Sequence, residues 1–162
     1  MRRNLLLLTL GLVLATAVGA IWWRLHAKRP PQVNASEYES DMTEGLVRGV
    51  LKELGGNAPS VCFLSFGEGR KPPSQAFVSR FATCRPEVRS AGSAVAPPIG
   101  KFFEISTGRR GLIIQVVEFR QIIPGCFEVV VAFSNLPAGR DHFIYRVVDE
   151  GGDWRVKSRT PV

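Results

Sequence analysis

The stretch LIIQVVEFRQIIPGCFEVVVAF, residues 112–133, decides the fold of this chain. Residues 112–119 are apolar on both strand faces, which is typical of a central strand covered on both sides over part of its length. Pro124 and Gly125 predict a turn, and apolar side chains then alternate with a second set through residues 126–133. The stretch therefore predicts two successive strands, the first of them inside a sheet.

More strands are predicted on both sides of this stretch. Upstream, residues 102–106 and a turn at 108–111 indicate a hairpin with residues 112–121. Downstream, residues 143–147 alternate in the same way, and a Gly-Gly pair separates them from a last strand around Trp154. These patterns predict an antiparallel meander of about four to five strands.

A helix is predicted before these strands. Ser36, with Glu39 three residues later, matches a capping box. Apolar residues then recur at helical spacing as far as Leu54, and Gly55-Gly56 ends the pattern. The apolar stripe indicates that this helix covers a sheet.

A strand, a loop and a short helix follow. Residues 61–66 form an apolar run that predicts a strand, and Ser74 predicts the cap of a helix that reaches about Thr83. The loop between them, residues 67–73, contains two glycines and two basic residues, which raises the question of phosphate binding. It lacks the GxxxxGK[ST] or GxGxxG order that points successive amides at a phosphate, so we do not assign that role from the sequence.

The N-terminal segment reads as a membrane span. Residues 5–23 carry no charge and no proline, and a helix of that length is roughly 28 Å long, close to the thickness of a bilayer core of roughly 30 Å. A cleaved signal peptide is the alternative. We therefore expect a transmembrane anchor over residues 1–24, a basic, proline-containing linker over 25–35 and a globular domain over 36–162. The expected localisation is a single-pass membrane protein with its domain on the extracytoplasmic, periplasmic side.

Gly11, Ala15 and Gly19 lie four residues apart in this segment. On a helix they line one face, the small-xxx-small arrangement that allows two spans to approach closely. They form the expected transmembrane dimer face, so a homodimer is one candidate assembly.

The basic excess does not indicate nucleic-acid binding. The formal charge is +7, but five basic residues within the first 29 supply +5, and the remaining 16 basic and 14 acidic residues supply +2. No basic patch with interleaved aromatics follows. The expected partners are the lipid bilayer and an envelope protein or a second copy of the chain, and not nucleic acid.

The three cysteines match no metal pattern, because there is no CxxC and no nearby histidine pair. Cys62 and Cys84 could form a disulfide if the domain lies outside the cytoplasm. The alternative is that all three are small apolar residues.

A helix folded onto a curved meander, followed by the YRVVDEGGDWRV hairpin at residues 145–156, resembles the cystatin-like and nuclear-transport-factor-2-like superfamily. It also looks like small single-span bacterial proteins that display such a domain. The resemblance implies an α+β fold in which an N-terminal transmembrane helix precedes a helix packed on a curved antiparallel β-meander. Members of the superfamily include enzymes, subunits of secretion machinery and proteins without an assigned role, so the resemblance does not select a function.

The sequence provides no catalytic, cofactor-binding or metal-ligating motif. Glu118, Arg120, Glu128 and Arg146 could share the less apolar face of the sheet, either as cross-strand ion pairs or as the polar floor of a pocket between sheet and helix. His142, next to Asp141 at a strand start, points to the opposite face from it.

These observations favour a membrane-anchored, non-catalytic binding or assembly module of the cell envelope. One alternative is a small hydrolase or isomerase that uses Glu118, Glu128 or His142 as an acid or base. Another is a subunit of a secretion or conjugation apparatus.

Overall fold

The computed structural model describes residues 35–57, 59–96, 101–136 and 139–162. The chain divides into two compact units, residues 1–32 and 33–162, and the first lies outside the described residues. The expected membrane span and its dimer face of Gly11, Ala15 and Gly19 therefore lie outside the described residues as well.

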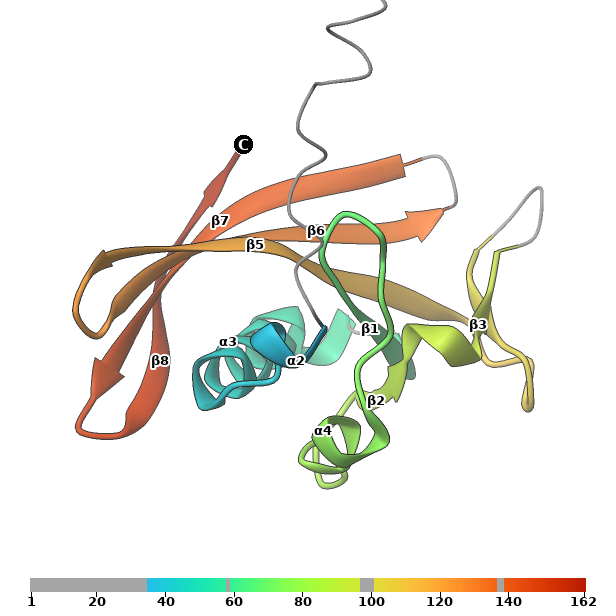
Figure 1. Ribbon diagram of the computed structural model, residues 1–162. Helices are drawn as coiled ribbons and strands as arrows, with labels where there is room; N and C mark the ends of the chain where they lie inside the picture. Colours follow the sequence, from blue (N-terminus) through green and yellow to red (C-terminus); the bar gives the residue numbers. More distant parts are fainter. Residues whose placement is uncertain (1–34, 58, 97–100, 137–138) are drawn as a thin grey trace, which may run out of the picture. The chain divides into compact units, whose positions relative to one another are not determined.

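A mixed sheet of six strands forms the centre of the second unit (Figure 1). Its strand order is β2-β1-β5-β6-β7-β8. The bounds are Val61–Phe66 for β1, Glu87–Ser90 for β2, Gly111–Ile123 for β5, Cys126–Leu136 for β6, Gly139–Glu150 for β7 and Asp153–Pro161 for β8. β5 to β8 pair antiparallel in chain order, whereas β1 pairs parallel with both β2 and β5.

The expected fold class, a helix on a purely antiparallel meander, is therefore wrong. β1 lies beside the central strand β5, and all six of its residues are buried, as is typical of parallel strands covered on both faces. The predicted hairpin of residues 102–106 with β5 is also wrong. Residues Phe103–Glu104 (β4) pair with Ala94–Val95 (β3) in a separate two-stranded sheet, and a single bridge from Phe103 to Arg110 is the trace of the predicted pairing.

The long helix begins later than the capping box predicts. A short helix α2 (Ala35–Tyr38) is followed by α3 (Asp41–Leu54). The cap of α3 is Ser40, whose Oγ accepts from the N–H of Thr43 at 3.2 Å. Glu39 turns away and accepts from the backbone N–H of Ser74 at 2.6 Å, where it supports the next helix, α4 (Gln75–Ser79). A short 3₁₀ turn, η1 (Gly55–Asn57), follows α3.

In residues 35–57, 59–96, 101–136 and 139–162, no helix is long and apolar enough to cross a membrane. The expectation of a single-pass membrane protein with an extracytoplasmic domain is corrected on this finding, and the localisation is not assigned.

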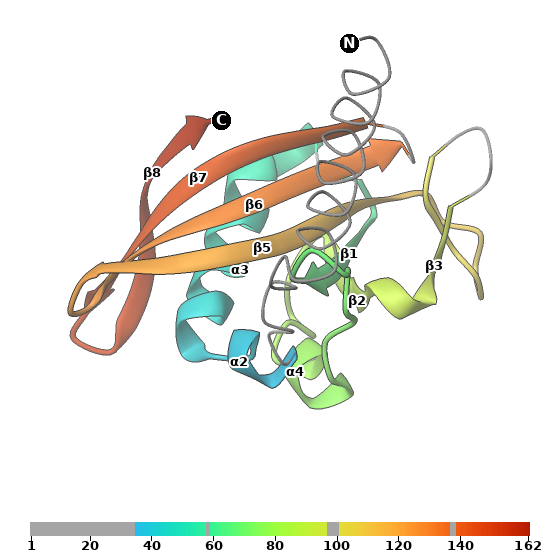
Figure 2. The ribbon, with the colours of Figure 1, turned by 45° about the horizontal axis from the view of Figure 1, so that its top comes forward.

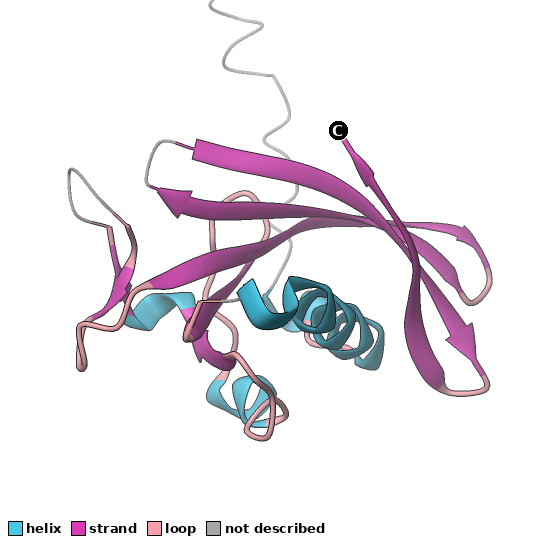
Figure 3. Cartoon of the chain, turned by 180° about the vertical axis from the view of Figure 1, so that it is seen from behind, coloured by secondary structure: helices cyan, strands magenta, loops and turns pink. Residues whose placement is uncertain are grey.

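Two glycines allow α3 to lie directly against the last hairpin. A Cβ on Gly45 would lie 2.4 Å from the carbonyl oxygen of Trp154, and one on Gly49 would lie 2.5 Å from a methyl group of Val156. Residues 45 and 49 share one helix face. This face of α3 is therefore a notch that fits the backbone of β8. Figure 3 shows α3 lying beside β8.

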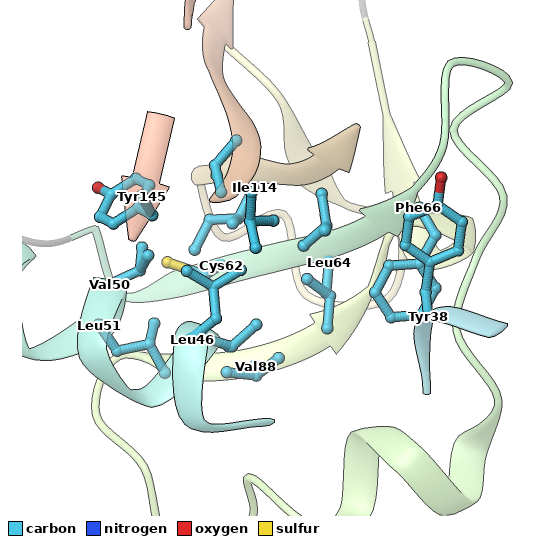
Figure 4. Close-up of a cluster of buried hydrophobic side chains, with 14 of the residues drawn as sticks. Tyr38, Leu46, Val50, Leu51, Cys62, Leu64, Phe66, Val88, Ile114 and Tyr145 are labelled. Atoms are coloured by element: carbon cyan, nitrogen blue, oxygen red, sulfur yellow. The ribbon is translucent and has the colours of Figure 1, made fainter. Parts of the chain in front are cut away.

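The main core lies between α3 and one face of the sheet. Leu46, Val50 and Leu51 of α3 meet Cys62 and Leu64 of β1 there, together with inward residues of β5 to β7 (Figure 4). The predictions that residues 61–66 form a strand and that Ser74 caps a helix are confirmed, since the Ser74 Oγ accepts from the N–H of Phe77 at 3.1 Å.

Tyr38 connects the start of the helical segment to the sheet. Its ring stacks on Phe66 with centroids 5.3 Å apart and meets Phe119 edge-on at 5.3 Å. Its hydroxyl donates to the carbonyl of Val117 at 2.8 Å, at the register shift between Val116 and Glu118 in β5. The tyrosine thus satisfies a carbonyl where the ladder is interrupted.

The opposite face of the sheet carries a smaller cluster, formed by Val61, Phe63, Phe102 and Ile113. A 3₁₀ turn, η2 (Ala91–Ser93), and the β3–β4 pair lie beside this cluster (Figure 2). Ion pairs link this segment to β2: Arg109 contacts Glu104 at 2.9 Å and Glu87 at 2.7 Å. Because strand residues alternate, Ser65, Gln115, Ala132 and Arg140 face the same side of the sheet as this cluster, and we call this side the far face.

Candidate functional site

A pocket of about 190 Å³ lies between the last turn of α3 and the sheet. The walls combine apolar, aromatic and charged side chains that converge from α3, β5, β6, β7 and β8. Its lining residues are Val50, Glu53, Leu54, Leu112, Phe133, Asp141, Phe143, Tyr145 and Arg159.

Arg159 of β8 lies over the aromatic wall of this pocket. Its guanidinium carbon is 3.6 Å from the centre of the Phe143 ring, 5.7 Å from that of Phe133 and 5.9 Å from that of Tyr145. Ring faces are negative, so they attract a cation at these distances. Three rings from β6 and β7 therefore form an aromatic box that holds one positive charge.

Carboxylates border the same box. Glu53 Oε2 accepts from the Tyr145 hydroxyl at 3.2 Å and lies 3.8 Å from Arg159 Nη1. Burial, and next the charge of Glu53, raises the pKa of Tyr145 well above its usual range, so its hydroxyl stays protonated and donates. Asp141 is the second carboxylate of the lining and is exposed to solvent. With Glu53, Asp141 and Arg159 charged, the pocket carries a net charge of −1.

The structure places the polar residues predicted from the sequence elsewhere. Arg120 contacts Glu128 at 2.7 Å, and Arg146 contacts it at 3.6 Å, in a row across β5, β6 and β7. These three residues therefore share a face, but it is the face turned away from α3, so they do not line the pocket. Glu118 is exposed on the same face of β5, two residues before Arg120, where it pairs with Val130 of β6.

The surroundings of Glu128 do not favour proton transfer near neutral pH. The hydrogen bond from Arg120 is the main cause that lowers the pKa of Glu128, which is the wrong direction for an acid or base that works near neutral pH. His142 lies on β7 opposite Ala132, on the same far face, and does not line the pocket.

All three cysteines are free, so the Cys62–Cys84 disulfide is not formed. Burial raises the pKa of the Cys62 thiol to about 12, which keeps it protonated and unreactive. Cys84 accepts a hydrogen bond from Arg48 Nη1 at 3.2 Å. In the described part of the chain, no three histidine, cysteine or acidic side chains gather as a metal would require.

The sequence patterns do not mark Glu53, Asp141 and Arg159 as site residues, and for Arg159 the reason is structural. Continued alternation from Trp154 and Val156 would point residue 159 away from the helix. The pairing of β7 with β8 shifts by one residue between Arg146 and Val147, so Arg159 pairs with Tyr145 and faces inward. No local signal in the sequence marks this bulge.

No protein-family model matches the chain, and searches of the curated proteins and of the solved structures returned no match either.

Proposed function

We propose that this protein is a binding module whose pocket takes a basic side chain of a partner protein. The observation that carries the proposal is the aromatic box beside two carboxylates, Glu53 and Asp141. A lysine or arginine side chain offers an apolar stem and a charged head. The stem would lie on Leu54 and Leu112, and the head would lie between the carboxylates.

Electrostatics support a cationic ligand. The pocket has a net charge of −1 even with Arg159 counted, so it attracts a cation and repels an anion. Arg159 is itself a demonstration that the rings accept a guanidinium group, at 3.6 Å from Phe143.

The volume supports a side chain as the ligand. Sites for drug-sized molecules typically enclose about 300–1,000 Å³, and this pocket encloses about 190 Å³. That space suits one long side chain, as presented by a peptide or a protein surface.

The alternative of a pocket enzyme gains no support. Glu118, Glu128 and His142, the candidate acids and bases, do not line the pocket.

The test is a titration of the full chain in which NMR signals of the Val50, Leu54 and Leu112 methyl groups report binding. The ligands are n-butylammonium and butyl guanidinium, with propionate at the same ionic strength as the anionic comparison. We expect saturable shifts with both cations and none with propionate. Glu53→Gln and Asp141→Asn should each weaken binding about 5- to 10-fold, which corresponds to about 1–1.4 kcal/mol.

The matched control is Glu118→Gln, which removes the same charge from the far face and should leave the affinity unchanged. Saturable binding of propionate that Arg159→Gln abolishes would overturn the proposal, because the pocket would then be an anion site. Equal weakening by Glu118→Gln would also overturn it, since the effect would then be one of net charge.

A further inference from the structure

Arg159 occupies the aromatic box of the pocket from within the same chain. Its guanidinium carbon lies 3.6 Å from the centre of the Phe143 ring, and its Nη1 lies 3.8 Å from Oε2 of Glu53. A ring face and a carboxylate are the same two features on which the proposed binding of a basic side chain rests. Arg159 therefore lies where a ligand would lie, as an internal ligand of the pocket.

The rings of the box hold one another without help from Arg159. Phe133 meets Phe143 edge-on with ring centroids 5.7 Å apart, and its centroid lies 6.5 Å from that of Tyr145. Tyr145 is 1% exposed and Phe133 is 9% exposed, so the core fixes both rings. The box would therefore keep its shape if the Arg159 side chain left it.

The Arg159 side chain is free to leave. β8 is the edge strand of the sheet (Figure 1), and the notch of α3 contacts it at Trp154 and Val156. Residues 157–161 are all exposed, and the Arg159 side chain is 40% exposed. An ion pair as exposed as the one with Glu53 contributes little stability. Rotation about its own bonds can carry the guanidinium into solvent while β8 stays paired with β7.

We propose that the basic side chain of the partner is an arginine, and that it displaces Arg159 from the rings. This inference rests on the proposed function and names its ligand. A guanidinium group is planar and weakly hydrated, so it stacks on a ring face, whereas the ammonium group of lysine is compact and strongly hydrated. The seat of Arg159 on Phe143 is thus a seat for the planar group.

The competition has a calculable size. An internal ligand lowers the apparent affinity by the fraction of time for which the box is free. A cation on a partly exposed ring is favoured about 2- to 5-fold over the free state, so the box is free for about a sixth to a third of the time. Removal of the internal ligand should therefore tighten the binding of an external guanidinium about 3- to 6-fold.

The experiment titrates the full chain with butyl guanidinium and n-butylammonium and follows the Arg159 Nε–Hε signal by NMR. The ring current of Phe143 shifts this signal while the guanidinium lies on the ring. We expect it to move to the position of an exposed arginine as the Val50 and Leu54 methyl signals saturate. Butyl guanidinium should bind at least about 3-fold tighter than n-butylammonium.

Two outcomes separate this inference from the proposed function. Saturable binding with an unchanged Arg159 signal, or with equal affinity for the two cations, would overturn the inference and leave the proposed function standing. No binding of either cation would overturn both.

Three variants separate competition from net charge. Arg159→Gln should tighten the binding of butyl guanidinium about 3- to 6-fold. Arg159→Lys keeps the charge but loses the planar group, so competition predicts tighter binding and net charge predicts no change. The matched control is Arg155→Gln, which removes one charge from the far face of the same strand and should leave the affinity unchanged. Weaker binding in Arg159→Gln, unchanged affinity in Arg159→Lys, or equal tightening in Arg155→Gln would each overturn the inference.

Discussion

The two faces of the sheet compensate their charged side chains in different ways. On the α3 face, Arg159 lies on a phenylalanine ring and beside Glu53, so its charge is compensated within the fold. On the far face, side chains of neighbouring strands compensate one another: Glu128 lies 2.7 Å from Arg120 and 3.6 Å from Arg146. The difference teaches that an aromatic wall shares in compensating a charge on the α3 face, whereas carboxylate–guanidinium pairs do so on the far face.

The largest expected effect tests how tightly the α3 face is closed. Gly45→Ala should lower the free energy of unfolding by about 2–3 kcal/mol, in the upper range for overpacking, because the new methyl meets the backbone oxygen of Trp154. Urea denaturation followed by circular dichroism measures the change. Gly56→Ala is the control, since no atom lies within 4 Å of its Cβ. Equal losses in both variants would mean that α3 does not pack closely on β8.

The next effect tests how the far face is covered. Glu104 is 4% exposed and accepts from Thr107 and from Arg109. Glu104→Gln should lower the free energy of unfolding by about 1–2 kcal/mol. The loss is smaller than for a fully buried ion pair, because the side chains of both partners, Arg89 and Arg109, are more than a third exposed. Denaturation at pH 7 measures it.

The same variant has a defined pH dependence. The Thr107 hydrogen bond, ahead of the arginine contacts, lowers the pKa of Glu104 below 4.5 in the folded state. The stabilisation is therefore present above pH 4.5 and is lost as the pH falls through the folded pKa. The difference between the original chain and Glu104→Gln should shrink below pH 4.5. A difference that stays constant down to pH 3 would contradict the ionised role of Glu104.

A smaller effect is expected inside the pocket. Tyr145→Phe removes the hydrogen bond to Glu53 but keeps the ring, so it should cost about 0.5–1.5 kcal/mol. Thermal unfolding measures it. Val130→Ala on the far face provides a comparison of a half-buried deletion without a hydrogen bond. Stability unchanged within about 0.5 kcal/mol in Tyr145→Phe would show that the bond contributes little.

The smallest expected effect compares one arginine from each face, Arg159 and Arg140. Arg159→Gln should lose about 0.5–1 kcal/mol, the amount typical of a partly exposed cation on a ring. Arg140→Gln should show no loss, because Arg140 is exposed and forms no ion pair among the described residues. Parallel denaturation of the two variants decides it. A larger loss in Arg140→Gln would reverse the comparison of the two faces.

Local patterns predicted those parts of the fold that local forces determine. The alternation over residues 126–133 gave the right strand, and Ser74 gave the right cap, because each depends on residues a few positions away. The parallel position of β1 depends on a partner 50 residues along the chain, Val61 with Gly111, and no short pattern encodes it.

The candidate site was less predictable for the same reason. The inward direction of Arg159 depends on one bulge opposite Arg146. The cap of α3 is Ser40 and not Ser36, and Glu39 binds Ser74 instead of closing a capping box. The glycine pair of the α3 notch is visible in the sequence, but only contact with Trp154 gives it a meaning.

Tyr38 has a mechanical consequence. Its hydroxyl donates a hydrogen bond to the central strand β5, and its ring stacks on Phe66 of β1 and meets Phe119 of β5 edge-on. A pulling force applied to the chain before residue 38 would load the middle of the sheet, where several strands must shear together, and not the edge, where one strand could peel away alone. We therefore expect Tyr38 to raise the force needed to pull residues 35–37 away from the sheet.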